Sequence, residues 1–171
     1  MWEFTGQKRP PFAVEPGSGQ ESVWDYTRPP TIVPDKRRVE VRVGDIVIAD
    51  SKRAVRVLET ASPPSFYIPA DDVRMDVLAP HPSSSWCEWK GTAKYWALNV
   101  KDRPREMIGW TYPKPTPEFE RIAGWFSFYP GRVECYVDGE RVQPQPGEFY
   151  AGWITKEIVG PFKGEADTND W

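Results

Sequence analysis

Cysteine and histidine are scarce in this chain of 171 residues. It contains two cysteines, Cys87 and Cys135, and one histidine, His81. Neither cysteine belongs to a C-x-x-C pair with the spacing of metal ligands, and two thiols are too few for a disulfide framework. We therefore expect reduced thiols, no structural zinc, and no other metal or cofactor.

Long apolar runs and an excess of basic residues are also missing. No stretch approaches the roughly 20 apolar residues that cross a bilayer, and residues 1–11 are polar and lack the apolar segment of a signal peptide. The net charge is −3, so the long-range field that draws proteins to phosphate backbones is lacking. These absences predict a cytoplasmic protein that binds neither membranes nor polymeric nucleic acid.

Aromatic residues, in contrast, are abundant: the chain has nine tryptophans, eight phenylalanines and seven tyrosines. Hydrophobic residues make up 39% of the chain, which excludes disorder throughout its length. A chain of this length can bury one hydrophobic core but is too short for a second independent domain. We expect one folded domain, either a monomer or a homodimer.

Prolines dominate the first 37 residues. Those at positions 10, 11, 16, 29, 30 and 34 exclude a helix or a central strand, because proline fixes φ and lacks a backbone donor. Apolar anchors such as Trp2, Phe4 and Trp24 are too many for a free linker. We predict that residues 1–37 form an extended arm packed on a core of residues 38–142, with either its own chain or a neighbouring one as the support.

Alternation of apolar and polar residues predicts strands through this core. Valines at positions 39, 41 and 43 alternate with charged residues, which is the period of a half-buried strand. Turn residues separate the further predicted strands, which cover 46–49, 54–60, 66–68, 73–78, 92–100, 106–112, 125–129 and 132–137. A loop bounded by prolines is expected over 79–85. The chain is therefore predicted to be mainly β.

Helix signals occur in one segment, near residues 117–123. Thr116 stands at the N-cap position, Pro117 at the first helical position and Gly124 where the helix should stop. This pattern predicts one short helix of about two turns, since a helical turn takes about 3.6 residues.

The end of the core is predicted to be a β-meander. Pro130-Gly131 joins two aromatic strands, and Asp138-Gly139 has the sequence of a type I′ hairpin turn. Residues 143–171 lack a clear period, but their aromatic residues predict a C-terminal extension that packs on the core. The last residues, 165–171, are expected to fray.

Polar and aromatic side chains from separate strands suggest the wall of a cavity. The set consists of Glu59, Tyr67, Cys87, Lys90, Tyr95, Trp96, Trp110 and Tyr112. A flat ligand such as a nucleoside, a cyclic imide or a sugar ring would stack on the aromatic faces while Glu59 or Lys90 holds its polar edge. In the alternative interpretation the aromatics form the core, and Glu59 pairs with Arg56 or Lys90 at its rim.

Two other functions stay open. One is an enzyme acting through Cys87, Lys90 and Glu59, because a nearby ammonium favours a reactive thiolate and His81 would complete a Cys-His dyad. No third residue that would orient the dyad is evident, so a module that binds a small molecule is preferred. The other is a surface that binds carbohydrate through Trp24, Trp89, Trp125 or Trp153.

Several motifs in the core resemble those of one family. They are Arg56-Val57-Leu58-Glu59-Thr60, Pro64-x-Phe66-Tyr67-Ile68-Pro69, Asp72-Val73-Arg74-Met75-Asp76, Cys87-Glu88-Trp89-Lys90-Gly91-x-Ala93-x-Tyr95-Trp96, Trp110-x-Tyr112 and Phe128-Tyr129. This pattern resembles domain of unknown function 427 over residues 38–142, and the flanking segments look like those of its longer members. The resemblance implies a β-tent, in which two small antiparallel sheets meet at an angle, similar to Mss4-like proteins.

The resemblance does not imply a zinc site or nucleotidyl transfer for this chain. Many β-tent proteins hold zinc between two C-x-x-C knuckles, which this chain lacks. The family is sometimes labelled a nucleotidyltransferase. An enzyme of the polymerase-β kind needs Gly-Ser followed by Asp-x-Asp to hold two metal ions, whereas Gly17-Ser18 lies in the proline-rich arm and no predicted strand carries Asp-x-Asp. The label therefore has little support in the sequence.

Overall fold

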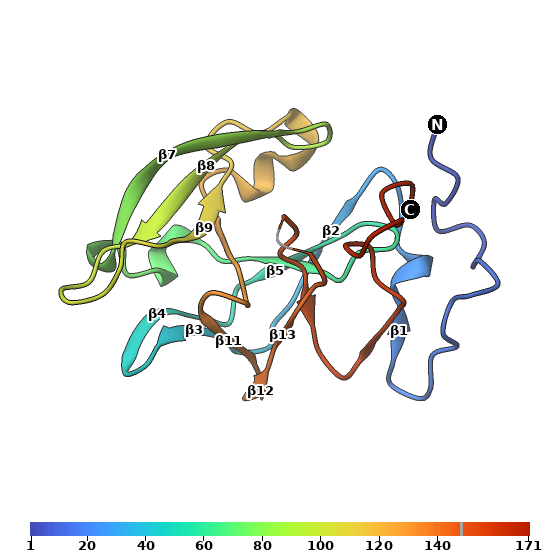
Figure 1. Ribbon diagram of the computed structural model, residues 1–171, viewed down its shortest axis with the longest axis horizontal. Helices are drawn as coiled ribbons and strands as arrows, with labels where there is room; N and C mark the ends of the chain where they lie inside the picture. Colours follow the sequence, from blue (N-terminus) through green and yellow to red (C-terminus); the bar gives the residue numbers. More distant parts are fainter. Residues whose placement is uncertain (148) are drawn as a thin grey trace.

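Two four-stranded antiparallel sheets form the centre of the fold in the computed structural model, which describes residues 1–147 and 149–171 (Figure 1). The first has the order β10-β9-β8-β7 and consists of Leu78–Cys87 (β7), Gly91–Leu98 (β8), Met107–Thr111 (β9) and Phe126–Phe128 (β10). The second has the order β12-β11-β3-β4 and consists of Val39–Val43 (β3), Ile46–Ser51 (β4), Glu134–Val137 (β11) and Glu140–Arg141 (β12).

Smaller sheets connect these two to the ends of the chain. A three-stranded antiparallel sheet has the order β2-β5-β6 and consists of Thr31–Pro34 (β2), Val55–Leu58 (β5) and Ser65–Tyr67 (β6). Two further pairs join Gln143–Pro144 (β13) with Trp153–Ile154 (β14), and Glu21–Ser22 (β1) with Ile158–Val159 (β15). The prediction of a mainly β fold made of small antiparallel sheets is confirmed. The tent-like arrangement stays a prediction.

The alternation of valines predicted to bury one face of β3 is confirmed. Val39 and Val41 are fully buried and pack in the main core with Ile48, Phe66 and Trp153. Strand β3 is enclosed on both edges because it pairs with β4 on one side and β11 on the other. The main core therefore lies beneath this sheet and includes side chains from the C-terminal extension.

Strand β8 packs against a different hydrophobic cluster on each of its faces, which agrees with its two partly apolar faces. Tyr95 belongs to the aromatic cluster that contains Trp110, whereas Trp96 packs against the main core beside Phe126. Successive side chains of a strand point to opposite faces, so one strand serves two packed layers. The strand consequently lies in the middle of its sheet, between β7 and β9.

Residues 79–85 were predicted to form a loop, and this prediction is wrong. They belong to β7, which pairs with β8 along nearly its whole length. Strand β7 is an edge strand of its sheet. It can include Pro80 and Pro82 because a proline at an edge need not donate a hydrogen bond to a further strand. The register shifts between His81 and Ser84, as in a β-bulge.

The predicted helix is present as a 3₁₀-helix, Pro117–Ile122 (η4). Pro117 begins it, and Gly124 follows it with a φ of 73°, which only glycine adopts freely. Thr116 does not cap the helix with its side chain; its hydroxyl donates instead to the Trp89 carbonyl at 2.6 Å. Shorter 3₁₀-helices cover Val23–Asp25 (η1), Ala70–Asp72 (η2) and Met75–Val77 (η3). No helix in residues 1–147 and 149–171 is long and apolar enough to cross a membrane.

The predicted meander at the end of the core is also wrong. Pro130-Gly131 connects β10 to β11, but β10 pairs with β9 whereas β11 pairs with β3. The two strands therefore lie in different sheets. The hairpin predicted at Asp138-Gly139 is confirmed, since both residues have positive φ, 47° and 80°, and join β11 to β12.

The two ends of the chain contact each other. Trp171 stacks on Phe12 with ring centroids 5.1 Å apart, and both rings approach Trp24. Trp171 is therefore packed against the N-terminal arm, and the expected fraying of residues 165–171 stays a prediction. The boundaries of the arm at residue 37 and of the extension at residue 143 stay predictions.

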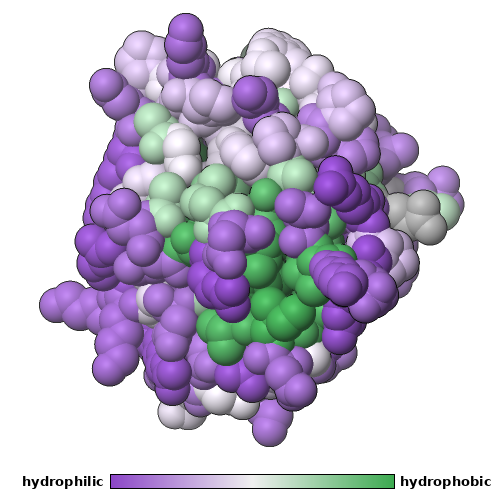
Figure 2. Space-filling model, turned by 90° about the vertical axis from the view of Figure 1, so that its left-hand side faces the viewer, coloured by the Kyte–Doolittle hydropathy of each residue, from purple (hydrophilic) through white to green (hydrophobic). Residues whose placement is uncertain are grey.

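Apolar side chains also gather between polar ones on the face at the left of Figure 1, as the space-filling view in Figure 2 shows. Partly buried hydrophobic residues at the edge of the main core are Val43, Ile46, Trp96 and Val100. They come from strands β3, β4 and β8 and from the segment after β8, so this edge of the core is only thinly covered.

Asp35 is the centre of a buried ionic network near β2. The Arg37 guanidinium donates to both of its carboxylate oxygens, at 3.0 and 2.6 Å, and Arg56 Nε lies 3.4 Å away. Burial acts to raise the pKa of Asp35, but the hydrogen bonds from Arg37 and the charge of Arg56 outweigh it, so the pKa is lowered.

Asp35 should make folding sensitive to acid. A carboxyl whose folded pKa is lowered stabilises the protein above its unfolded pKa, about 3.9, and loses this contribution as the pH falls further. We expect Asp35→Asn to lower the free energy of unfolding by about 1–3 kcal/mol at pH 7. The two proteins should converge as the pH falls below about 4, measured by urea denaturation across a pH series. A difference that stays constant with pH would contradict this role of Asp35.

Candidate functional site

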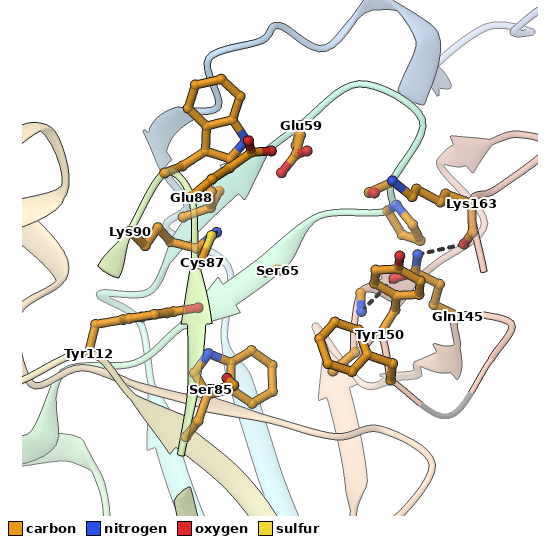
Figure 3. Close-up of a pocket in the computed structure, with 18 of the residues that line it drawn as sticks. Glu59, Ser65, Ser85, Cys87, Glu88, Lys90, Tyr112, Gln145, Tyr150 and Lys163 are labelled. Carbon is orange, nitrogen blue, oxygen red and sulfur yellow. Dashed lines mark hydrogen bonds between the residues drawn. The ribbon is translucent and has the colours of Figure 1, made fainter. Parts of the chain in front are cut away.

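A cavity of about 280 Å³ lies between two sheets and the C-terminal extension (Figure 3). One wall is formed by strands β7, β8 and β9, and the facing wall by β5 and β6. Residues 145 and 149–152, together with Lys163, close it on a third side. The cavity is therefore assembled from segments that are distant in the sequence.

Cross-strand pairing places neighbouring side chains of each wall on the same face of their sheet. Tyr95 pairs directly with Trp110 between β8 and β9, and Val57 pairs with Ser65 between β5 and β6. Directly opposed residues of an antiparallel pair project from the same face of the sheet. Each pair therefore presents both of its members to the cavity.

The aromatic wall is held together by its own contacts. Trp110 Nε1 donates to the Tyr67 hydroxyl at 3.2 Å, and the two rings meet edge to face. Tyr129 also packs against Trp110, with ring centroids 5.0 Å apart. Burial raises the pKa of Tyr67, Tyr112 and Tyr129, so all three phenols are neutral at physiological pH. The aromatic part of the wall is therefore uncharged.

Lys90 is the buried cation of the cavity. It is only 9% exposed, and its Nζ lies 3.6 Å from Cys87 Sγ and about equally far from the ring centres of Tyr112 and Phe119, 5.7 and 5.8 Å. Within the described part of the chain, no oxygen accepts a hydrogen bond from Nζ and no carboxylate lies within 4 Å of it. Burial acts to lower the pKa of Lys90, but the ionisable Tyr67, Cys87 and Glu59 raise it, so the group stays an ammonium.

The start of helix η4 fixes the backbone around Lys90. The Lys90 carbonyl accepts a hydrogen bond from the Thr116 backbone N–H at 3.1 Å, next to the hydroxyl bond that Thr116 makes to Trp89. Gly91 follows with a φ of 99° and lets the chain turn from β7 into β8. The tight turn from Cys87 to Gly91 therefore places the thiol and the ammonium side by side.

Glu59 lies at the rim of the cavity and pairs with Arg28, not with Arg56 or Lys90 as one interpretation expected. Its Oε2 lies 3.3 Å from Arg28 Nε. Arg56 is engaged elsewhere, with Glu21 and Asp35. The carboxylate of Glu59 is thus already neutralised by a partner from the N-terminal segment.

Seven of the eight side chains predicted to form the cavity wall line it, and Trp96 does not. Its Nε1 donates to Thr111 Oγ1 at 3.1 Å, and its ring lies 5.3 Å from that of Phe126 in the main core. Trp96 follows Tyr95 directly, and adjacent strand residues point to opposite faces. The predicted set included two neighbours of which only one can face the cavity.

The structure does not form the Cys-His dyad. His81 pairs with Tyr95 and lies six residues before Cys87 on the same extended strand, a separation of roughly 15–20 Å at the rise of a β-strand. His81 is also not part of the cavity wall. A catalytic role for Cys87 would have to do without this base.

Sequence reasoning missed several residues of the wall. They include Trp2, Ser65, Ser85, Tyr129, Gln145, Tyr150 and Lys163. Ser85 alternates with Cys87 and would have been found had β7 been recognised as a strand. Lys163 and Gln145 lie in irregular segments, where the Gln145 side chain donates to the Lys163 carbonyl at 2.6 Å, and no local pattern marks them (Figure 3). Burial and the nearby Arg28 lower the pKa of Lys163.

The tryptophans proposed as a carbohydrate platform are not all available for stacking. Trp24 and Trp153 are completely buried, so they are part of the core. The aromatic side chains that are exposed at the cavity are instead Trp86 and Phe149, each 71% exposed. Trp89 and Trp125, the other two predicted members of the platform, are partly buried.

The fold and the site together define a small, mainly β protein with a partly enclosed aromatic cavity that contains a buried lysine. Residues 31–139, more than half of the chain, match the family described as Domain of unknown function (DUF427), and the chain belongs to this family. The match begins with strand β2, before the predicted start of the core at residue 38. A comparison with curated proteins gives no match. The function has to be inferred from the cavity itself.

Proposed function

We propose that this protein binds a small, flat or ring-shaped molecule in its aromatic cavity. The observation that carries the proposal is the buried ammonium of Lys90, for which the described residues supply no oxygen acceptor. A buried charge is costly unless it is paired and hydrogen-bonded, and a ligand oxygen would supply that partner. A polar ligand group that enters the cavity would therefore provide the acceptor that Lys90 lacks among the described residues.

The size and lining of the cavity favour a ligand of one or two rings. Its volume, about 280 Å³, is close to the lower end of ligand cavities, about 300 Å³. Tyr95, Trp110 and Tyr112 offer aromatic surface, while Ser65 and Ser85 offer hydroxyl groups for a polar edge. A nucleoside-like, imide-like or sugar-like ring has this combination of faces and edges.

A thermal-shift screen tests the proposal with nucleosides, sugars, cyclic imides and aromatic acids as probes. A ligand present at 100 times its Kd adds about 2.7 kcal/mol to the free energy of unfolding, which corresponds to a rise in Tm of about 5–10 °C for a domain of this size. We expect at least one class of ring compound to produce such a rise.

A cavity-filling variant provides the matched control. Ser85→Phe places a ring inside the cavity and should abolish the rise in Tm, whereas Ser84→Phe, at an exposed position outside the cavity wall, should retain it. If every probe leaves the Tm of the unmodified protein unchanged, or if both variants respond alike, the cavity is not the binding site.

One observation also favours a second function, an enzyme that uses Cys87 as a nucleophile. The Lys90 ammonium lies 3.6 Å from Cys87 Sγ, so a cation stands directly beside the candidate nucleophile. Glu59 is engaged with Arg28 and His81 is remote, so neither supplies the general base. Binding without chemistry requires no general base, and we therefore prefer it.

A further inference from the structure

We infer that the cavity selects ring compounds that carry an acidic group, with the anionic oxygens of that group placed against Lys90 beside Cys87. The inference rests on the proposed function, because it specifies the charge of the ligand that the cavity binds. It excludes neutral nucleosides and neutral sugars as the preferred ligands.

The surroundings of the Lys90 ammonium carry the inference. An ammonium has three N–H donors, and Lys90 Nζ has one sulfur neighbour and two aromatic rings. The rings of Tyr112 and Phe119 attract the cation through their faces but accept no strong hydrogen bond. A carboxylate, sulfonate or phosphate would make the short charge-assisted bonds that the described residues leave unmade.

Among the described residues, the other charged groups of the cavity form no ion pair with Lys90. Glu59 is paired with Arg28, and Glu88 is exposed. Lys163, in the wall formed by the C-terminal segment, adds no negative charge; its Nζ donates to the main-chain oxygen of Trp171 at 3.2 Å and lies over the ring of Trp2. In the described part of the wall, no carboxylate therefore contacts the Lys90 ammonium.

Cys87 offers a direct probe of this charge because its sulfur lies next to the ammonium. Iodoacetate and iodoacetamide alkylate thiols by the same displacement of iodide and have nearly the same shape, but only iodoacetate is an anion. We expect the ratio of their rate constants at Cys87, iodoacetate over iodoacetamide, to be at least about tenfold higher in the folded protein than in the urea-unfolded chain. Peptide mass spectrometry assigns the label, and the fully buried Cys135 should stay unlabelled in the folded protein, which verifies that the protein is folded during the reaction.

Variants at lysine positions identify the source of the preference. Lys90→Met should return the ratio to that of the unfolded chain, while Lys94→Met, an exposed lysine on β8 outside the cavity, should leave it high. Lys90→Arg keeps the charge and should keep the preference, which preserves the test if Lys90→Met does not fold. A folded-state ratio equal to the unfolded one, or no reaction of Cys87 with either reagent, would overturn the inference.

The thermal-shift screen separates this inference from the proposed function. If neutral rings stabilise the protein as well as their carboxylate counterparts do, for example benzamide as well as benzoate, the cavity binds ligands but has no preference for acids. If the alkylation ratio is high but no ring compound stabilises the protein, the cavity attracts anions and the proposed ring binding fails. If benzoate stabilises the protein, benzamide does not, and the effect of benzoate is lost in Lys90→Met, both the proposed ring binding and the preference for acids are supported.

Discussion

Replacing Trp153 with alanine is expected to lower the free energy of unfolding by about 3–5 kcal/mol, the usual cost of removing a large aromatic side chain from a core. Trp153 is completely buried in the main core, where its ring stacks on Phe66 with centroids 4.7 Å apart. Its Nε1 also donates to the Phe128 carbonyl at 3.0 Å. Alanine would leave a cavity and an unpaired carbonyl.

This prediction tests whether the C-terminal extension is an integral part of the fold. Urea denaturation gives the free energy of unfolding, and Trp86→Ala is the matched control because Trp86 is 71% exposed and should change it by no more than about 0.5 kcal/mol. Trp153→Phe keeps much of the packing, so its loss of unfolding free energy should lie between those of the two alanine variants. Equal effects of the two alanine variants would show that β14 and the segment around it are dispensable for stability.

Replacing Arg28 with methionine is expected to lower the free energy of unfolding by about 2–4 kcal/mol, close to the cost of breaking a buried ion pair. The Arg28 side chain is only 1% exposed and pairs with Glu59, which is 24% exposed and therefore recovers some solvation when it is left alone. The guanidinium also donates to three main-chain oxygens, those of Phe4, Thr60 and Trp171. One side chain thus connects both ends of the chain to the core.

A surface arginine serves as the control for Arg28. Arg38 pairs with Asp50 at 2.8 Å but is 51% exposed, so Arg38→Met should change the free energy of unfolding by about 0–1 kcal/mol. Arg28→Lys keeps the charge but lacks the planar array of guanidinium donors. Its free energy of unfolding should lie between those of the two methionine variants. A loss of less than about 1 kcal/mol in Arg28→Met would contradict the connecting role, since a buried pair normally costs more to break.

Local patterns were sufficient to predict the strands whose environment repeats with period two. The valines of β3 and the two apolar faces of β8 are examples, because each strand meets a packed layer that its own sequence reflects. The turn at Asp138-Gly139 was predictable for the same reason, since its backbone requires positive φ at both positions.

Features that depend on distant partners were not predictable from local patterns. Strand β7 contains two prolines, and only its position at the edge of a sheet makes them acceptable. The pairing of β10 with β9 and of β11 with β3 depends on which sheet each strand joins, and nothing in Pro130-Gly131 specifies that choice.

The candidate site was also predictable only in part. Seven wall residues come from strands or turns whose polar and aromatic composition is unusual, and these were found. Lys163 and Tyr150 were missed because the extension reaches the cavity through segments that have no period. Trp96 was included because composition alone does not say which face of β8 meets the cavity.

The alternation along β8 has a consequence for protein engineering. Tyr95 belongs to the cavity and Trp96 to the main core, so inserting or deleting one residue in this strand would exchange the two environments and damage both. A cavity redesigned for another ligand should therefore be altered by substitution at Tyr95 and its cross-strand partner Trp110, with the length of β8 kept constant.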